Sequence, residues 1–329
     1  MNHEDVHFIA KKRKYIKRRR NRRIAVLVLL CTAILVVWAV IISLASNIFG
    51  EEKAVTTALN ESEQVTAQTS EVVSEKSSFY GNAQTLSLEI PQSSAFEGTL
   101  TLVSDHLGYG IPSKKPMLTT IWGNKSQTYR VASSMLSLAN EAFLAADKMF
   151  CDYNNETSNG DYQITMAYSG DSPMCCTEHG TGYAFDVNVY TNSGMSMRLV
   201  EAGGIYNWIY ENCAKYGFVL RYGKDKTAVT GMAYDADHFR YVGVGHAEYM
   251  SERGMALEDY IGEVQKHIYG EKHLEFSYGG VDYEVFYVNL PTDVASAEIE
   301  IPADVSYTVS GDNIGGVIVT LYKQSNSAN

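Results

Sequence analysis

A histidine and an aspartate lie seven residues apart in the segment Thr177–Asp186, which reads TEHGTGYAFD. His179 stands beside a glycine, as in a loop, whereas Asp186 lies in a run whose apolar and polar residues alternate as in a strand. A loop histidine and a strand aspartate can converge on one ion, and neutral imidazole and carboxylate are both good ligands for Zn²⁺. Catalytic zinc sites usually have three protein ligands and one open position, so a third ligand is expected elsewhere in the chain.

His238 is the candidate for that third ligand, in the segment Thr230–Gly243, which reads TGMAYDADHFRYVG. Asp235 lies three residues before it, close enough in sequence for its carboxylate to face a water on the same ion and act as the general base. Each histidine taken alone is more often a structural or surface residue than a ligand. Together, the residues favour a zinc site made by His179, Asp186 and His238.

The surrounding pattern predicts an α+β fold, with a small antiparallel sheet and helices packed against it. Apolar residues recur at three- and four-residue steps from Val131 to Phe150, which predicts a helix with one buried face. A second helix is predicted over Val200–Tyr216, ended by Gly217. Strands are predicted at 163–168, 184–190, 218–222 and 238–242. The metal would then lie at the surface of the sheet.

The motifs around these residues resemble those of the VanY-type zinc D-Ala-D-Ala carboxypeptidases, within the wider group of bacterial cell-wall metallopeptidases. The first family motif, S-x-H-x-x-G-x-A-x-D, matches Thr177–Asp186 except that threonine replaces the serine. The second family region resembles W-x-x-x-N-A-x-x-Y-G-F-x-x-R-Y followed by T-G-x-x-Y-E-P-W-H-F-R-Y-V-G. The residues that match it are Trp208, Asn212, Tyr216 to Phe218, Arg221, Tyr222, Thr230, Gly231, Tyr234 and His238 to Gly243. The resemblance runs from roughly Thr99 to Ile261, about half of the chain.

The resemblance implies a role for each of the candidate residues. It implies that His179, Asp186 and His238 hold zinc. Asp235 stands where the family has its catalytic glutamate, and Thr177 stands where the family has a hydroxyl that helps to bind the terminal carboxylate of the substrate. The implied substrate is the stem peptide of peptidoglycan.

Three positions depart from the family pattern. Asp235 is one methylene shorter than glutamate, and Ala236-Asp237 replaces the usual Pro-Trp. The family also has an arginine in an upstream Y-R-S-type segment, where it can bind a terminal carboxylate, whereas Met166–Ser172 contains none. Arg240 is the candidate replacement, because alternation along a strand puts it on the same face as His238. The alternative for Arg240 is a structural arginine paired with a nearby acid.

The N-terminal residues predict a membrane anchor. Residues 1–23 contain ten Lys and Arg side chains against Glu4 and Asp5, and residues 24–46 contain no charge. At about 1.5 Å per residue, the uncharged run spans a bilayer core of about 30 Å as one transmembrane helix. The basic tail holds the N-terminus in the cytoplasm, so a single-pass protein with an extracellular catalytic domain is expected. A cleaved signal peptide is the alternative.

Composition predicts the remaining boundaries. Residues 47–80 are rich in Glu, Thr, Ser and Ala, which predicts a flexible stalk, and residues 81–268 would form the zinc peptidase domain. Several β-like runs over 269–329 predict a small β-rich C-terminal appendage. The net charge is −11 and is more negative still without the basic tail, so nucleic acid is not an expected partner.

Three functions are compatible with these observations. The leading one is a zinc D,D-carboxypeptidase-like hydrolase that trims D-amino acids from peptidoglycan stem peptides. The missing upstream arginine also allows a peptidoglycan endopeptidase of the same fold, which would cut internal crossbridges. The third is a non-catalytic cell-wall-binding protein, because the base motif around Asp235 is altered whereas the three predicted ligands are intact.

Overall fold

The computed structural model describes residues 80–81, 83–104, 107–110, 112, 116–121, 128–132, 134–135, 137–158, 163–168, 178–190 and 196–325. The predicted basic tail, the predicted membrane anchor and all but the last residue of the predicted stalk lie outside this set. Among the described residues, no helix is both long enough and apolar enough to cross a membrane.

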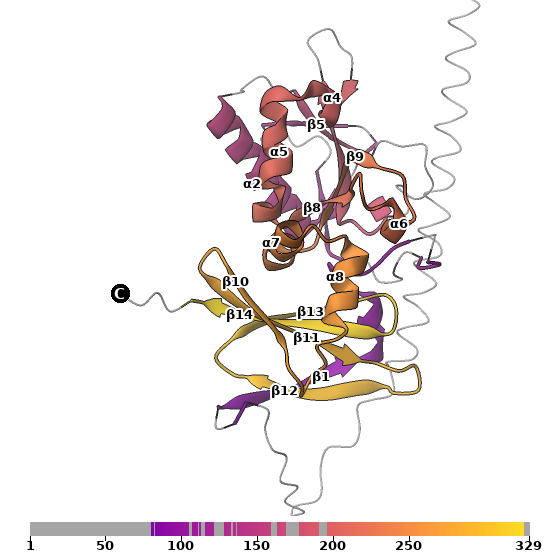
Figure 1. Ribbon diagram of the computed structural model, residues 1–329, viewed down its shortest axis with the longest axis vertical. Helices are drawn as coiled ribbons and strands as arrows, with labels where there is room; N and C mark the ends of the chain where they lie inside the picture. The colour runs from indigo at the N-terminus through magenta and orange to yellow at the C-terminus, as the bar shows by residue number, and fades with distance from the viewer. Residues whose placement is uncertain are drawn as a thin grey trace, which may run out of the picture. The chain divides into compact units, whose positions relative to one another are not determined.

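A six-stranded sheet carries the candidate site residues (Figure 1). Its strands follow the order β3 (Arg130–Val131), β5 (Ile164–Ala167), β6 (Ala184–Tyr190), β9 (Asp235–Tyr241) and β8 (Phe218–Tyr222), and β7 (Ser196–Arg198) also pairs with β6. Neighbouring strands are antiparallel except for β3 with β5. The predicted strands 184–190 and 218–222 are confirmed with the same bounds.

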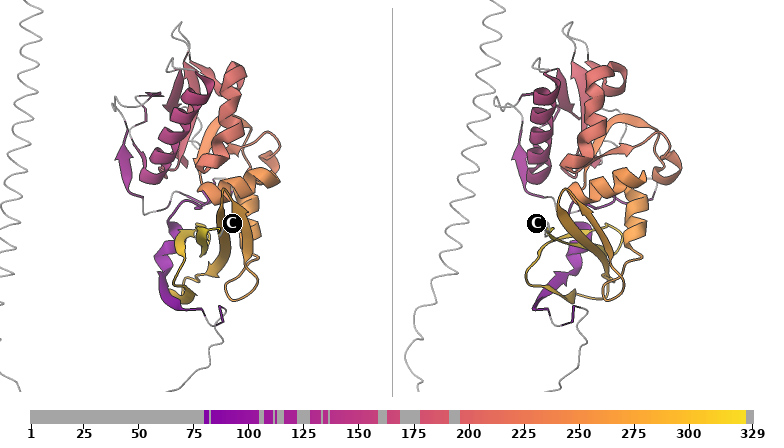
Figure 2. Two further views of the ribbon diagram at one scale, coloured as in Figure 1. Left: turned by 90° about the vertical axis from the view of Figure 1, so that its left-hand side faces the viewer. Right: turned by 60° about the vertical axis from the view of Figure 1, so that its left-hand side comes forward.

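Alternation along β6 decides which face of this sheet is buried in the main core. Phe185, Val187 and Val189 belong to that core. The helices α2 (Asn140–Thr157) and α5 (Asn207–Asn212) contribute the residues that pack on them, and Figures 1 and 2 show the two helices against this sheet. Asp186 alternates with these apolar residues and therefore points to the opposite face.

Two helices differ from their predicted bounds. α2 begins at Asn140, because the residues just before it form β4 (Ser137–Ala139), which pairs with β2 (Leu118–Thr120). The predicted helix over 200–216 is interrupted at Gly203 and Gly204, whose φ angles of 54° and 57° are left-handed. The observed segments there are α4 (Leu199–Ala202), η2 (Gly204–Tyr206), α5 and η3 (Cys213–Tyr216).

The C-terminal strands form a second sheet. Its order is β10 (Leu274–Tyr278), β11 (Val281–Asn289), β14 (Gly316–Gln324) and β13 (Ser306–Gly311). β12 (Ser296–Pro302) pairs instead with β1 (Thr85–Pro91), which is followed by the short helix η1 (Gln92–Phe96) (Figure 1). The C-terminal β region therefore includes a strand from the start of the segment that composition assigned to the peptidase domain.

Apolar contacts join the two sheets. The helices that follow β8 and β9 are α6 (Thr227–Thr230), α7 (Val244–Arg253) and α8 (Leu257–Val264). Residues of α7 and α8 share one hydrophobic core with β11 and β14, and its members include Ala247, Leu257, Ile261, Val285 and Ile318. The result is a mixed helix-and-sheet fold in which the C-terminal β region packs against the helices that continue from the central strands.

Candidate metal centre

The three predicted ligands come together on the face of the six-stranded sheet opposite the main core. Asp186 on β6 and His238 on β9 are direct cross-strand partners, and His179 lies in the turn before β6. Asp186 Oδ1 lies 3.1 Å from His179 Nε2 and 2.9 Å from His238 Nδ1. One ligand atom from each residue lies within 4.8 Å of the others, and all three residues are buried.

The chemistry of this cluster fits a divalent metal such as zinc. Burial acts to raise the pKa of Asp186, but the hydrogen bonds with His179 and His238 outweigh that effect and hold the pKa below its ordinary value. Two imidazole nitrogens and one ionised carboxylate oxygen, aimed at one another at this spacing, form a donor set that zinc commonly uses. The described residues could therefore hold zinc through His179, Asp186 and His238.

Glu178, which the sequence did not single out, orients His238 through the ring nitrogen that faces away from Asp186. Its Oε2 lies 2.8 Å from His238 Nε2, and the side chain is fully buried. When Nε2 donates to Glu178, a neutral His238 has a lone pair on Nδ1. That lone pair faces the carboxylate oxygen of Asp186 at 2.9 Å, so a proton or a cation is needed between the two atoms. This carboxylate–histidine arrangement is typical of the partners that surround metal ligands.

Two buried arginines compensate the charge of Glu178. Its Oε1 accepts from Arg221 Nε at 3.0 Å and from Arg240 Nη1 at 2.8 Å, and the hydroxyl of Tyr222 donates to Oε2 at 3.3 Å. Burial acts to raise the pKa of Glu178, but Arg221 and the other cationic neighbours hold it well below its ordinary value. Glu258 accepts two further hydrogen bonds from Arg221, at 2.8 and 2.7 Å. The network thus keeps Glu178 ionised beside His238.

Arg240 is not placed to receive a substrate carboxylate directly. It lies on the same face of β9 as His238, as alternation predicts, but its side chain is fully buried. Besides Glu178, its guanidinium donates to the carbonyl oxygens of Thr99 and Thr101, both at 2.9 Å. This placement favours the alternative drawn from the sequence, a structural arginine paired with an acid.

Asp235 lies outside the cluster, at the first position of β9. Its Oδ1 accepts from Arg198 Nη2 at 3.1 Å and from the backbone N–H of Asp237 at 3.0 Å. Arg198 Nε also donates to Asp237 at 2.7 Å. The Asp235 side chain is 30% exposed and that of Arg198 is 46% exposed. Arg198, which sequence patterns did not reveal, is therefore a solvent-accessible cation held beside the predicted base.

Tyrosine rings pack against the rings of the two histidines. The ring of Tyr168 stacks on His179 with centroids 4.5 Å apart, and the ring of Tyr222 lies 5.1 Å from that of His238. Burial raises the pKa of Tyr168 to about 12, so its hydroxyl stays protonated and donates to the carbonyl of Ser137. Thr177, the predicted substrate-binding hydroxyl, lies outside the described residues.

The sheet and the candidate metal-binding cluster lie in one segment of the chain that can be compared with known proteins. It is a mixed helix-and-sheet domain in which two histidines and an aspartate converge at adjacent strands, and these three residues could hold a metal ion. Residues 137–244 contain the whole cluster and match the family model for VanY, D-alanyl-D-alanine carboxypeptidase. The matched segment is about a third of the chain, and over that segment the chain is similar to the VanY-type family.

Two curated relatives are both named D-alanyl-D-alanine carboxypeptidase. The one from Enterococcus faecium is 38% identical over 157 residues, which cover 48% of this chain and 48% of that relative. The one from Enterococcus faecalis is 32% identical over 109 residues, which cover 33% of this chain and 37% of that relative. This chain therefore spans about half the length of these relatives or less.

A solved structure extends the likeness beyond the matched domain. The vancomycin resistance D,D-dipeptidase VanXYg, solved in complex with a D-Ala-D-Ala phosphinate analog, is similar over 73% of this chain and 100% of its own. The TM-score is 0.59 and the sequence identity is 21%. This likeness shows the mixed helix-and-sheet fold.

Proposed function

We propose that this chain is a membrane-anchored zinc D,D-carboxypeptidase that acts on peptidoglycan stem peptides. The observation that carries the proposal is the convergence of His179, Asp186 and His238 inside a VanY-type domain. The names of the curated relatives support the same activity. The buried charge network behind His238 supports a preorganised metal ligand rather than a remnant of one.

Each residue near the cluster has a role in this proposal. His179 Nε2, Asp186 and His238 Nδ1 would hold zinc, which when bound polarises a carbonyl group and lowers the pKa of water. Glu178 accepts the N–H of His238 Nε2, and this leaves Nδ1, which faces Asp186, unprotonated for the metal. Asp235 would take a proton from the water that attacks the scissile carbonyl and pass it to the leaving amine as the C–N bond breaks.

Binding of the substrate carboxylate requires donors at the mouth of the site. We assign one of them to the hydroxyl of Thr177, on the strength of its place in the family motif. Both Arg240 and Arg198 pair with acids, but Arg240 is fully buried and Arg198 is 46% exposed, so Arg198 is the better candidate for the cation. Strand pairing places Arg198 opposite Asn188, two residues from Asp186, and alternation then puts Arg198 and Asp186 on one face of the sheet.

Release of D-alanine from a synthetic stem pentapeptide tests the activity. The full-length protein should release it, a chelator should abolish the release, and added zinc should restore it. A pentapeptide with an amidated C-terminus separates the modes, since an endopeptidase tolerates the block and a carboxypeptidase does not. Zinc-loaded protein that cleaves neither an amidated nor a free stem peptide would leave only the non-catalytic wall-binding function.

The membrane anchor is tested separately. The charge-free run 24–46 after a basic tail supports a single-pass protein with its catalytic domain outside the cell. The full-length protein should sediment with membranes and resist extraction at high salt. Protease added to intact cells without a wall should remove the domain that contains His238. Recovery in the soluble fraction would contradict the anchor without touching the enzymatic proposal.

A further inference from the structure

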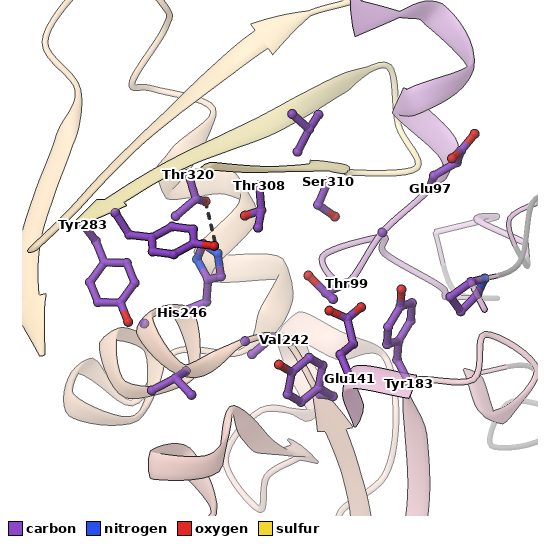
Figure 3. A pocket seen from close by; sticks show the side chains of 18 of the residues that line it. Glu97, Thr99, Glu141, Tyr183, Val242, His246, Tyr283, Thr308, Ser310 and Thr320 are labelled. Atoms are coloured by element: carbon purple, nitrogen blue, oxygen red, sulfur yellow. Dashed lines mark hydrogen bonds between the residues drawn. The ribbon is translucent and has the colours of Figure 1, made fainter. Parts of the chain in front are cut away.

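A cavity of about 700 Å³ lies between the segment that joins β9 to α7 and the strands β13 and β14 (Figure 3). None of the cluster residues lines it. Its size is within the range of small-molecule sites in proteins. It is therefore a second site to be explained, separate from the candidate metal centre.

The charged groups that line the cavity are acidic. Glu141 comes from the first turn of α2 and Glu97 from the residue after η1, and the described lining residues include no lysine and no arginine. Glu141 reaches solvent, and although the burial of part of its side chain raises its pKa, the neighbouring Tyr183 acts in the opposite direction. Figure 3 shows Glu141 and Tyr183 together on one wall, near Thr99. An anionic ligand is disfavoured in such a cavity, and a cation is favoured.

Aromatic rings supply the second element of a cation site. Four tyrosines line the cavity, and they are Tyr183, Tyr241, Tyr283 and Tyr322. The first two stack on each other with ring centroids 6.5 Å apart. The faces of tyrosine rings attract ammonium groups, and their carbon frames bury an alkyl chain. Carboxylates with such rings suit a cation on an aliphatic stem.

The cavity walls are held in place by close packing. A Cβ atom built on Gly245 would lie 2.5 Å from the ring of Tyr283, so the glycine lets α7 and that ring approach each other. His246 lies in the floor, with Nδ1 2.6 Å from the hydroxyl of Tyr260 and Nε2 3.2 Å from Thr320 Oγ1. Burial lowers the pKa of His246 to about 4, so the ring adds no positive charge at neutral pH. The opposite wall presents the exposed hydroxyl of Thr308, whereas the buried hydroxyl of Ser310 accepts from Leu100 N–H and donates to the carbonyl of Gly311 (Figure 3).

We propose that this cavity binds an amine-bearing ligand of amino-acid size. Its ammonium group is held by Glu141, with Glu97 adding negative potential, and its alkyl chain packs on the tyrosine rings. The exposed hydroxyl of Thr308 on the opposite wall hydrogen-bonds the polar backbone of the ligand. The site is independent of the metal, because it shares no residue with the cluster.

Calorimetric titration of the full-length protein with Nα-acetyl-L-lysine amide tests this proposal. The buffer contains a chelator, so that any binding measured does not depend on a metal ion at the candidate metal centre. Saturable binding is expected that weakens as salt is added. Nα,Nε-diacetyl-L-lysine amide has the same stem without the charge. Its affinity should be lower than that of the amine by about tenfold or more.

Variants locate the binding in the cavity. Glu141→Gln should weaken binding of the amine about tenfold, and Thr308→Trp should abolish it by filling the cavity from the exposed strand β13. Glu211→Gln, an exposed acid on α5 away from the lining, is the matched control and should bind as the wild type does. Thermal unfolding of each variant confirms that it is folded.

Three results would overturn the proposal. One is equal binding of the amine and its acetylated form, and another is unchanged binding by Glu141→Gln and Thr308→Trp. The third is binding of neutral N-acetylglucosamine in place of the amine, which would identify a sugar site instead. Loss of D-alanine release with intact amine binding would count against the proposed function alone.

Discussion

Replacing Glu178 by glutamine perturbs the metal centre without touching a metal ligand. The amide keeps the shape of the side chain and removes the charge that faces His238, Arg221 and Arg240. If the amide oxygen accepts from His238, its NH₂ group must face guanidinium donors. If the amide is turned round, its NH₂ group faces Nε2 of His238, which can accept only in the tautomer that carries its proton on Nδ1, the atom that would bind zinc. Neither orientation satisfies all the buried donors while His238 Nδ1 is left unprotonated for the metal.

The size of the effect follows from the partners that remain. Breaking one side of a buried ion pair costs about 3–5 kcal/mol. Arg221 keeps its two hydrogen bonds to Glu258, whereas Arg240 keeps only uncharged acceptors, which are backbone carbonyl oxygens and the hydroxyl of Thr101. We therefore expect Glu178→Gln to lower the free energy of unfolding by about 3 kcal/mol, and to weaken zinc binding about 10- to 100-fold.

Urea unfolding at pH 7 and competition with a chromophoric zinc chelator measure the two quantities. Glu258→Gln is the control, because Glu258 accepts hydrogen bonds from Arg221 and lies beyond it from His238 in the network. It should lower stability and leave zinc affinity unchanged. The reasoning is refuted if Glu178→Gln binds zinc as tightly as the wild type, or if both variants lose zinc affinity to the same extent.

Three further predictions concern other parts of the molecule. Burial lowers the pKa of His246 from 6.5 to about 4, so the unfolded chain takes up this proton first as the pH falls. The wild type should then lose up to about 3 kcal/mol between pH 6.5 and 4 relative to His246→Gln, as urea unfolding at several pH values would reveal. Asp235→Asn should reduce kcat for D-alanine release by about 100-fold or more at unchanged zinc content, and equal turnover would remove Asp235 from the mechanism. Gly245→Ala should lower the free energy of unfolding by about 1–3 kcal/mol, because the new methyl group meets the ring of Tyr283; an unchanged thermal midpoint would show that the ring moves away freely.

Local patterns predicted much of the framework that holds the cluster. The alternating run 184–190 and the apolar run 218–222 form strands with the predicted bounds, because side chains of alternating character suit a sheet with one core face. The same alternation put Asp186 on the face away from the core. Residue type and motif spacing were enough to name His179, Asp186 and His238 as a group, and the structure brings their ligand atoms within 4.8 Å of one another.

Contacts between distant parts of the chain decided the surroundings of that cluster. Glu178 and Arg240 are 62 residues apart, and no local pattern shows that they form an ion pair in the interior. The pairing of Asp235 with Arg198 and of β1 with β12 likewise depends on which segments the fold places side by side. By itself, the sequence determined which residues could bind a metal, because ligand chemistry and strand periodicity are local properties. Only the tertiary structure decided which charges are buried and which reach solvent, because burial depends on every segment that packs around a side chain.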